Sequence, residues 1–396
     1  MQKMLMKYAG IASILAVLGG VAAGSALAAP KYSATALGYD FTPMDMNNSG
    51  TIVGYYEDWA HSTVRAVRSG SGSMIDLSTI GERQSEASGI NDSGQIVVSA
   101  RFPHGPKGEQ SYGRAFLLDS NGAKTDLGNL GGSNASASAI NNSGQVVGWS
   151  SLTGDTEHHA FLYSGGSMSD LGTFGAAYSF SYATAINNSG QVVGMRPLSV
   201  GGGYDFYLNH GFLSSGGSMT DLGQAEPKRI NDSGQVLLLD SLYGHGSIYS
   251  GGTITYLGAL YTYDESCDWL CTSPVSTGLD INNSGQVVGT ATYSTYSESR
   301  VGFLYTDGSI FDLNHLVEGA SPGETWDWST DLRIEAAWAI NDSGQIAATG
   351  YLNGYYGIIR LDPISGPAVP VPEPEGYAMM LAGLVVIAWS KKIRRH

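Results

Sequence analysis

Aromatic residues with polar neighbours are the side chains of this sequence that are best suited to binding chemistry. They gather in segments of variable length that separate short apolar runs. Rings of this kind can stack on the faces of sugars or anchor a protein partner. We therefore predict a binding surface made of Tyr55, Tyr56, Trp59, Phe102, Tyr112, Tyr204, Phe206, Tyr207, Tyr293, Tyr296, Trp326 and Trp328.

The same variable segments hold the carboxylates that glycoside hydrolysis would need. These are Asp155, Glu157, Asp205, Asp264, Glu265 and Asp327. Hydrolysis requires two carboxylates that face one another across the scissile bond, and no spacing in the sequence pairs any two of them. A polysaccharide lyase or glycosidase is thus the alternative interpretation. The leading one is a non-enzymatic binding protein with no catalytic residue.

Two cysteines, Cys267 and Cys271, are the only ones in the chain. In an exported protein they meet an oxidising compartment, and we predict that they form a disulfide within a long loop. A redox pair is disfavoured, because three residues separate the cysteines and no thioredoxin-like pattern surrounds them. We expect no metal site and no cofactor, because no histidine cluster or phosphate-binding loop accompanies them.

Internal repeats show how these residues would be positioned. The phrase Asn-(Asn/Asp)-Ser-Gly occurs seven times, beginning at Asn47 and then at intervals of 44 to 59 residues. A second phrase follows each copy and is most complete at 159–172, with degenerate copies near Arg65, Arg114, His210, His245, Val301 and Tyr356. Residues repeated in several copies, including the Asp of Asp-Leu-Gly, are predicted to be structural because one active site does not need several copies.

Each repeat divides into four short strands, which in the third copy are expected at 136–140, 145–149, 160–163 and 167–171. Asn-Asn-Ser-Gly and Ser-Gly-Gly form the first and third turns, since Asn and Ser hydrogen-bond the turn and Gly adopts a positive φ. Four strands in about 45 residues are typical of one propeller blade. A β-solenoid fits less well, because its coils are shorter and more uniform.

We therefore predict an all-β fold, a seven-bladed β-propeller of four-stranded blades. The seventh copy ends after three strands near 356–361, while a matching fragment, Thr35-Ala36-Leu37-Gly38, precedes the first copy. An N-terminal strand that completes the last blade would close the ring and leave no exposed sheet edge. In this topology the tight turns lie at one end of the propeller, and the long aromatic segments gather at the other.

The pair of phrases resembles the HAF repeat of exported bacterial proteins, named for the His159-Ala160-Phe161 triplet that only the third copy keeps in full. The resemblance covers nearly the whole chain between the two ends. It implies an extracellular repeat protein and assigns no biochemical activity.

The N-terminal 28 residues have the three parts of a secretory signal peptide. Lys3 and Lys7 precede an apolar run at 11–23, and Ala26-Leu27-Ala28 offers a cleavage site. An uncleaved anchor is disfavoured, because the apolar run is short and ends in small residues. We thus predict a signal peptide at 1–28, a propeller at 29–362 and a linker at 363–371.

The C-terminal segment 372–396 joins Pro372-Glu373-Pro374 to an apolar stretch at 376–389 and a basic end. Fourteen helical residues span about 21 Å, which is short for a bilayer core of about 30 Å. The segment resembles the PEP-CTERM sorting signal, which implies a transient transmembrane helix, processing by an exosortase in the inner membrane, and bacteria that secrete exopolysaccharide. The sorting motif would be Pro372, Glu373 and Pro374.

Charge narrows the choice of partner. The chain has a formal net charge of −15, and only 14% of its residues are charged. Such an acidic surface repels phosphate backbones, so we expect no nucleic-acid binding. The sequence as a whole predicts a protein of the cell surface or biofilm matrix whose propeller binds exopolysaccharide or another envelope component.

Overall fold

The part of the chain that carries the repeats is built almost entirely of β-strands. The computed structural model describes residues 30–38, 41–58, 60–70, 73–78, 84–104, 110–173, 180–199, 207–240, 244–260, 275–292, 300–320 and 331–364. The predicted signal peptide and sorting segment lie outside these ranges. Within them, no helix is both long and apolar enough to cross a bilayer.

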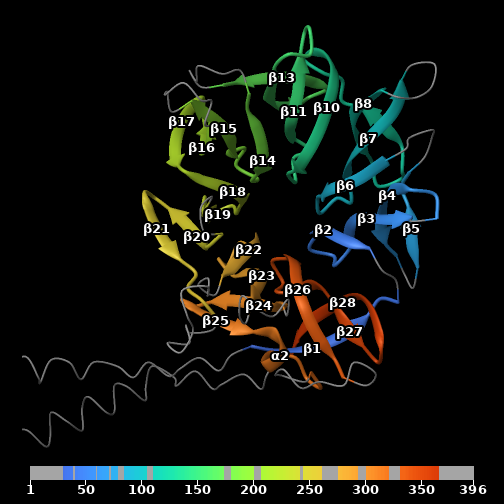
Figure 1. The fold of residues 1–396 in the computed structure, drawn as a ribbon, viewed down its shortest axis with the longest axis vertical. Helices are drawn as coiled ribbons and strands as arrows, with labels where there is room; N and C mark the ends of the chain where they lie inside the picture. Colours follow the sequence, from blue (N-terminus) through green and yellow to red (C-terminus); the bar gives the residue numbers. More distant parts are fainter. Residues whose placement is uncertain are drawn as a thin grey trace, which may run out of the picture.

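The sheets are arranged around a common axis, as in a β-propeller (Figure 1). Each copy of the repeat is here called a unit, and the units supply the strands in chain order. The first three units comprise β2 (Thr42–Met46), β3 (Ile52–Asp58), β4 (Thr63–Ser69), β5 (Met74–Asp76); β6 (Gln84–Ile90), β7 (Ile96–His104), β8 (Gln110–Leu118), β9 (Lys124–Asp126); and β10 (Gly131–Ile140), β11 (Val146–Leu152), β12 (His158–Ser164), β13 (Ser167–Gly172).

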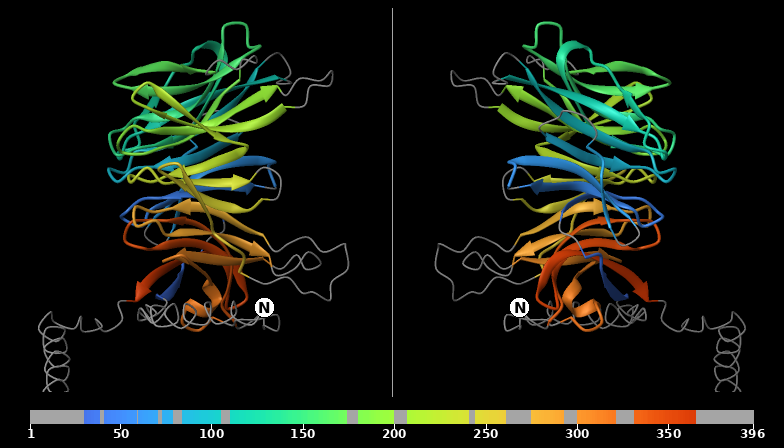
Figure 2. Two further views of the ribbon diagram at one scale, coloured as in Figure 1. Left: turned by 90° about the vertical axis from the view of Figure 1, so that its left-hand side faces the viewer. Right: turned by 90° about the vertical axis from the view of Figure 1, so that its right-hand side faces the viewer.

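The remaining units follow the same order. They comprise β14 (Tyr182–Ile186), β15 (Val192–Ser199), β16 (Tyr207–Ser215), β17 (Ser218–Gly223); β18 (Ala225–Ile230), β19 (Val236–Asp240), β20 (Gly246–Ser250), β21 (Thr253–Tyr256); β22 (Ser276–Ile281), β23 (Val287–Thr292), β24 (Arg300–Thr306), β25 (Ser309–Asp312); and β26 (Arg333–Ile340), β27 (Ile346–Leu352), β28 (Tyr355–Ile364). Two views from the side show these sheets stacked with their strands crossing the molecule (Figure 2).

Five of the sheets are four-stranded, and an eight-stranded sheet joins the first two units. That join is a single parallel pair, Val64 with Gln84. In the sheet of the seventh unit, β1 (Lys31–Ala36) pairs antiparallel with β28. The N-terminal strand therefore begins several residues before the predicted fragment at 35–38, and Leu37 continues the contact through its N–H to the Ile358 carbonyl at 3.0 Å.

The four strands predicted for the third unit are present, and each of them is longer than expected. The hydrophobic core lies between neighbouring units. For example, Val97 and Ala115 of the second unit pack against Ala135 and Phe161 of the third. Strands that are covered by a neighbour on both faces need apolar residues at consecutive positions, which explains the Val-Val pairs of the repeat.

One departure from the repeat changes the local fold. In the sixth unit Asn314 replaces the Gly of Asp-Leu-Gly, and the chain there forms a short helix, α2 (Leu313–Leu316). Asp312 caps this helix by accepting a hydrogen bond from the Asn314 N–H at 2.8 Å. The Asn314 side chain then bonds the backbone of Ile334 in the next unit, at 2.7 and 3.1 Å. The sequence analysis did not predict this helix.

Candidate functional site

The turn that joins the first two strands of each unit has the hydrogen bonds expected from its sequence. In the third unit the Asn141 Oδ1 atom accepts hydrogen bonds from the N–H groups of Ser143 at 3.1 Å and Gln145 at 3.0 Å. Gly144 closes the turn with a φ of 74°. The predicted structural role of this phrase within its own turn is thus confirmed.

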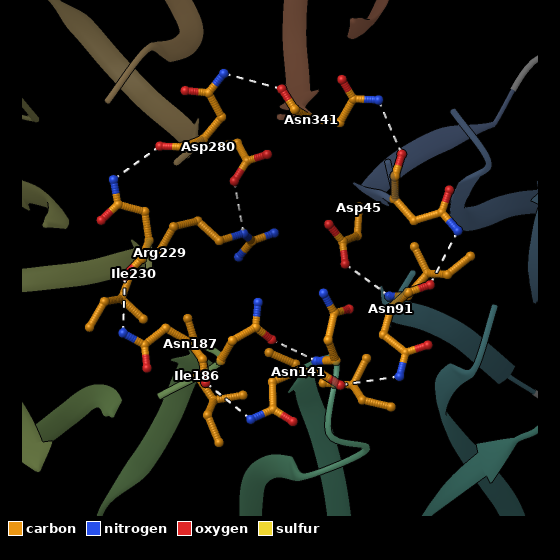
Figure 3. A pocket seen from close by; sticks show the side chains of 18 of the residues that line it. Asp45, Asn91, Asn141, Ile186, Asn187, Arg229, Ile230, Asp280 and Asn341 are labelled. Carbon is orange, nitrogen blue, oxygen red and sulfur yellow. Dashed lines mark hydrogen bonds and ion pairs between the residues drawn. The ribbon is translucent and has the colours of Figure 1, made fainter. Parts of the chain in front are cut away.

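The first Asn of each turn also links its unit to the next one. Its side-chain Nδ2 donates to the backbone carbonyl of the equivalent Asn in the following unit, and the last of these bonds, from Asn341, returns to Asn47 (Figure 3). The donors are Asn47, Asn91, Asn141, Asn187, Asn231, Asn282 and Asn341, with distances of 3.0 to 3.2 Å. All seven side chains are buried. The cycle therefore satisfies polar groups that would otherwise be costly to bury.

The second residues of the turns form another cycle of hydrogen bonds, here called the outer cycle, which is exposed whereas the first cycle is buried. Its backbone N–H donates to the side-chain Oδ1 of the second residue in the next unit at 2.8 to 3.0 Å. Around this cycle the residues are Asn48, Asp92, Asn142, Asn188, Asp232, Asn283 and Asp342. No two aspartates are neighbours, and each carboxylate accepts side-chain N–H groups from the asparagines on both sides. This order avoids adjacent like charges.

Three charged side chains line the axis just behind these cycles. In four units the residue two positions before the ring Asn is small, whereas in the first, fifth and sixth it is Asp45, Arg229 and Asp280. Arg229 Nε lies 3.5 Å from Asp280 Oδ1, and Arg229 Nη2 donates to the Met44 carbonyl at 2.9 Å. Arg229 thus joins two distant units across the axis (Figure 3).

Burial controls the protonation of the two carboxyl groups on the axis. It raises the pKa of Asp280 to about 7; Arg229 opposes this shift and Asp45 adds to it. Burial likewise raises the pKa of Asp45, although Arg229 and the Ile90 N–H lower it. Near neutral pH, a single guanidinium therefore faces two carboxyl groups that hold protons more tightly than usual.

Together these residues line a cavity of about 170 Å³ at the end of the axis. We call this end, which carries the Asn-(Asn/Asp)-Ser-Gly turns, the asparagine end. Its amide and carboxylate groups are largely occupied by bonds within the protein, which leaves few for a ligand. Among the residues with described positions, no group of three or more His, Cys, Asp or Glu could hold a metal ion.

The opposite end of the axis, here called the crossover end, is where the second strand of each unit ends and the third strand begins. Four predicted binding residues have described side chains near it. Tyr55 and Tyr56 lie on β3, and Tyr56 packs against a core cluster. Phe102 and Tyr112 are cross-strand partners on β7 and β8, with stacked rings whose centroids are 5.6 Å apart. All four are half-buried.

The other predicted site residues cannot be placed. Tyr207 lies on β16, but its side-chain surroundings are not described. The following lie outside the described ranges: Trp59, Tyr204, Phe206, Tyr293, Tyr296, Trp326, Trp328, Cys267, Cys271, Pro372, Glu373 and Pro374. Of the six candidate carboxylates, Asp155 accepts a hydrogen bond from the Ser133 N–H at 2.7 Å, which lowers the pKa of its carboxyl.

The repeated Asp of Asp-Leu-Gly has the structural role predicted for it. In the third unit Asp170 faces His159 at 2.8 Å and accepts the Gly172 N–H at 2.6 Å. Asp221 of the fourth unit pairs with His210 and accepts the Gly223 N–H at 2.8 Å. These bonds join the third and fourth strands of a unit at its surface.

Sequence reasoning missed the contacts between units. The identical Asn that opens all seven phrases was a signal for the inner cycle, because a turn alone accepts Asp or Ser as well. The charged trio also had a signal: Asp45, Arg229 and Asp280 occupy a position that elsewhere holds Gly or Ala. Only the fold brings these three residues together.

Comparison with known proteins finds one family model and several solved structures that are similar to this chain. A family model described as "Protein of unknown function (DUF3466)" matches residues 175–355, slightly less than half of the chain. No curated protein matches the sequence. Among solved structures, the β-propeller domain of the Trilobed protease from Pyrococcus furiosus is similar at 12% identity and a TM-score of 0.47, covering 86% of this chain and 100% of that one.

Two further structures show a similar level of likeness. YCF48 bound to D1 peptide has 12% identity and a TM-score of 0.48, covering 87% of this chain and 99% of that one. Virginiamycin B lyase from Staphylococcus aureus has 10% identity and a TM-score of 0.47, covering 84% of this chain and 99% of that one. Likeness at this level carries no ligand or reaction over to this chain.

Proposed function

We propose that this protein is an exported β-propeller that binds exopolysaccharide or another envelope component at its crossover end. The observation that carries the proposal is the contrast between the two ends of the same inner strands. At the asparagine end, repeated residues are used in bonds between units. At the crossover end the connections differ in length and composition from unit to unit, as expected where a rigid scaffold presents a binding surface.

The scaffold in this proposal is a seven-bladed propeller whose last blade is completed by the N-terminal strand. Two observations support it: the pairing of β1 with β28 and the hydrogen bond from Asn341 to the Asn47 carbonyl. A shortened protein that lacks residues 29–38 should then unfold at a lower urea concentration than the mature chain. Equal midpoints would contradict this role for β1.

Export and sorting belong to the same proposal and rest on the two end segments. The mature protein would begin at Ala29 after export by its signal peptide, be held transiently in the inner membrane by its C-terminal segment, and be cut by an exosortase near Pro372-Glu373-Pro374. The intact mass of the protein recovered from its native host tests this. A mass that includes His396 would instead indicate an unprocessed tail and remove the main support for a matrix location.

The binding function is tested with the exopolysaccharide of the producing strain. The purified protein should cosediment with that polymer and should leave its chain length unchanged. No binding to any polymer from the strain would contradict the proposal. Shortening of the polymer, lost when a pair of carboxylates is replaced, would support the alternative of a lyase or glycosidase.

A further inference from the structure

A polar groove lies between the second and third units, away from the asparagine end. It encloses about 280 Å³, near the lower limit of about 300 Å³ for small-molecule pockets. Its lining comes from five strands of the two units, and the polar side chains that border it include Gln84, Glu86, Ser99, Arg101 and Asn134. None of these residues belongs to the predicted aromatic surface.

Strand pairing explains which side chains face this groove. Gln84 pairs with Arg101 and Glu86 with Ser99, so these four side chains share one face of the second sheet. Ser85, on the other face, accepts the Ala66 N–H of the first unit at 3.0 Å. The four side chains therefore point towards the third unit, where Ser99 Oγ accepts the Ala137 N–H at 3.0 Å.

A small side chain in the second unit leaves room for the groove. The position of Ser99 carries a large side chain in four other units, namely Tyr55, Trp149, Met195 and Leu239, and a threonine in the remaining two. The large residues can fill a junction between units, whereas Ser99 leaves space beside Glu86 and Arg101. This space, bordered by exposed polar side chains, makes the groove a candidate for ligand binding.

The chemistry of the lining suits a sugar. Gln84, Glu86 and Arg101 are exposed and supply both donors and acceptors for hydroxyl groups. No ion pair joins Glu86 or Arg101 to another residue of the described chain. Trp149 also borders the groove, but its ring packs against His158 and Tyr182, with centroids 5.3 and 6.3 Å away, at the junction with the fourth unit.

The geometry points to this groove as a subsite for one neutral hexose unit of a polysaccharide, which rests on the proposed function above. A neutral sugar is favoured over a uronate for two reasons. The chain carries a net charge of −15, and the groove holds one carboxylate, Glu86, and one guanidinium, Arg101, so it has no net positive charge. The matched donors and acceptors of Gln84, Glu86 and Arg101 would fix the sugar through its hydroxyl groups.

Calorimetric titration of the purified full chain tests the assignment, with neutral gluco-, manno- and galacto-hexasaccharides and a uronate hexasaccharide as probes. At least one neutral probe should bind. The double replacement Glu86→Ala with Arg101→Ala should weaken that binding at least tenfold. Ser99→Leu should weaken it similarly while the protein stays folded, because Leu239 already occupies the equivalent position in the fifth unit. Glu226→Ala, at the position equivalent to Glu86, is the matched control and should bind as the wild type does.

Each outcome separates this inference from the proposed function. A folded Ser99→Leu protein that binds the neutral probe as tightly as the wild type would overturn the subsite, even if the polymer of the producing strain still binds elsewhere. Tighter binding of the uronate than of every neutral probe would overturn the ligand class. Loss of probe binding in the groove variants supports the subsite, even if the native polymer fails to bind.

Discussion

The asparagine end and the groove between the second and third units are two regions near opposite ends of the inner strands. They use polar residues in opposite ways. At the asparagine end every unit repeats the same side chain, and each amide is bonded to a neighbouring unit. In the groove the side chains vary from unit to unit, and Glu86 and Arg101 remain exposed. Repetition with full hydrogen bonding thus indicates a structural role, whereas exposed polar groups beside an unfilled space indicate a candidate site.

The largest expected effect breaks the inner cycle at the asparagine end. Asn187→Ala removes the acceptor for the Gln191 N–H and the donor to the Asn231 carbonyl, both buried or half-buried. Each buried polar group left unpaired costs about 1–3 kcal/mol, so we expect the free energy of unfolding in urea to fall by about 3 kcal/mol. Ser189→Ala, two residues on and exposed, is the control and should change it little. Equal values for the two variants would mean that the cycle is not stabilising.

The charged trio should make stability depend on pH. The pKa of Asp280 is about 7 in the folded protein and about 3.9 in an unfolded chain. The contribution of Asp280 to the free energy of unfolding is therefore fully present below about pH 4 and is lost as pH rises through about 7. Asp280→Asn removes this loss, so between pH 5 and pH 8 the variant should gain about 2 kcal/mol relative to the wild type.

Urea unfolding at the two pH values measures this gain. A difference between variant and wild type that stays constant from pH 5 to pH 8 would contradict the assignment of the raised pKa to Asp280.

A smaller effect tests the order of charges in the outer cycle. Asn283 donates to the carboxylates of Asp232 and Asp342, both at 3.0 Å. Asn283→Asp would remove both bonds and place three carboxylates side by side, which we expect to cost about 1 kcal/mol at low salt and less at high salt. Asn188→Asp is the matched comparison, because Asn188 has only one aspartate neighbour, and its loss should be about half as large. Equal losses at both positions would argue against repulsion along the cycle.

The smallest effect is expected at the outer surface. His159→Ala removes the contact of His159 Nδ1 with Asp170 Oδ2 at 2.8 Å near the surface, while Asp170 keeps its hydrogen bond from the Gly172 N–H at 2.6 Å. Exposed pairs contribute roughly 0–1 kcal/mol, so the urea midpoint should barely move. A loss greater than that of Asn283→Asp would show that the surface pair matters more than the order of charges in the outer cycle.

Much of the fold was predictable, because its signals are local. The Asn-Asn-Ser-Gly turns, the strands of the third unit and an N-terminal strand all follow from short-range patterns. The helix α2 was missed because a single change, Gly to Asn314, decides it. The groove was missed because Gln84, Glu86 and Arg101 are unremarkable singly, and only strand pairing brings them to one face.

The sequence by itself determined the repeat, the four-stranded unit and the residues that close each turn, because these depend on contacts within a few residues. Only the tertiary structure decided that Asn47 meets Asn341, that Arg229 reaches Met44 across the axis, and that Ser99 leaves a space before the third unit. Those contacts join residues far apart along the chain. They exist only once the units have packed around a common axis and the spaces between them are set.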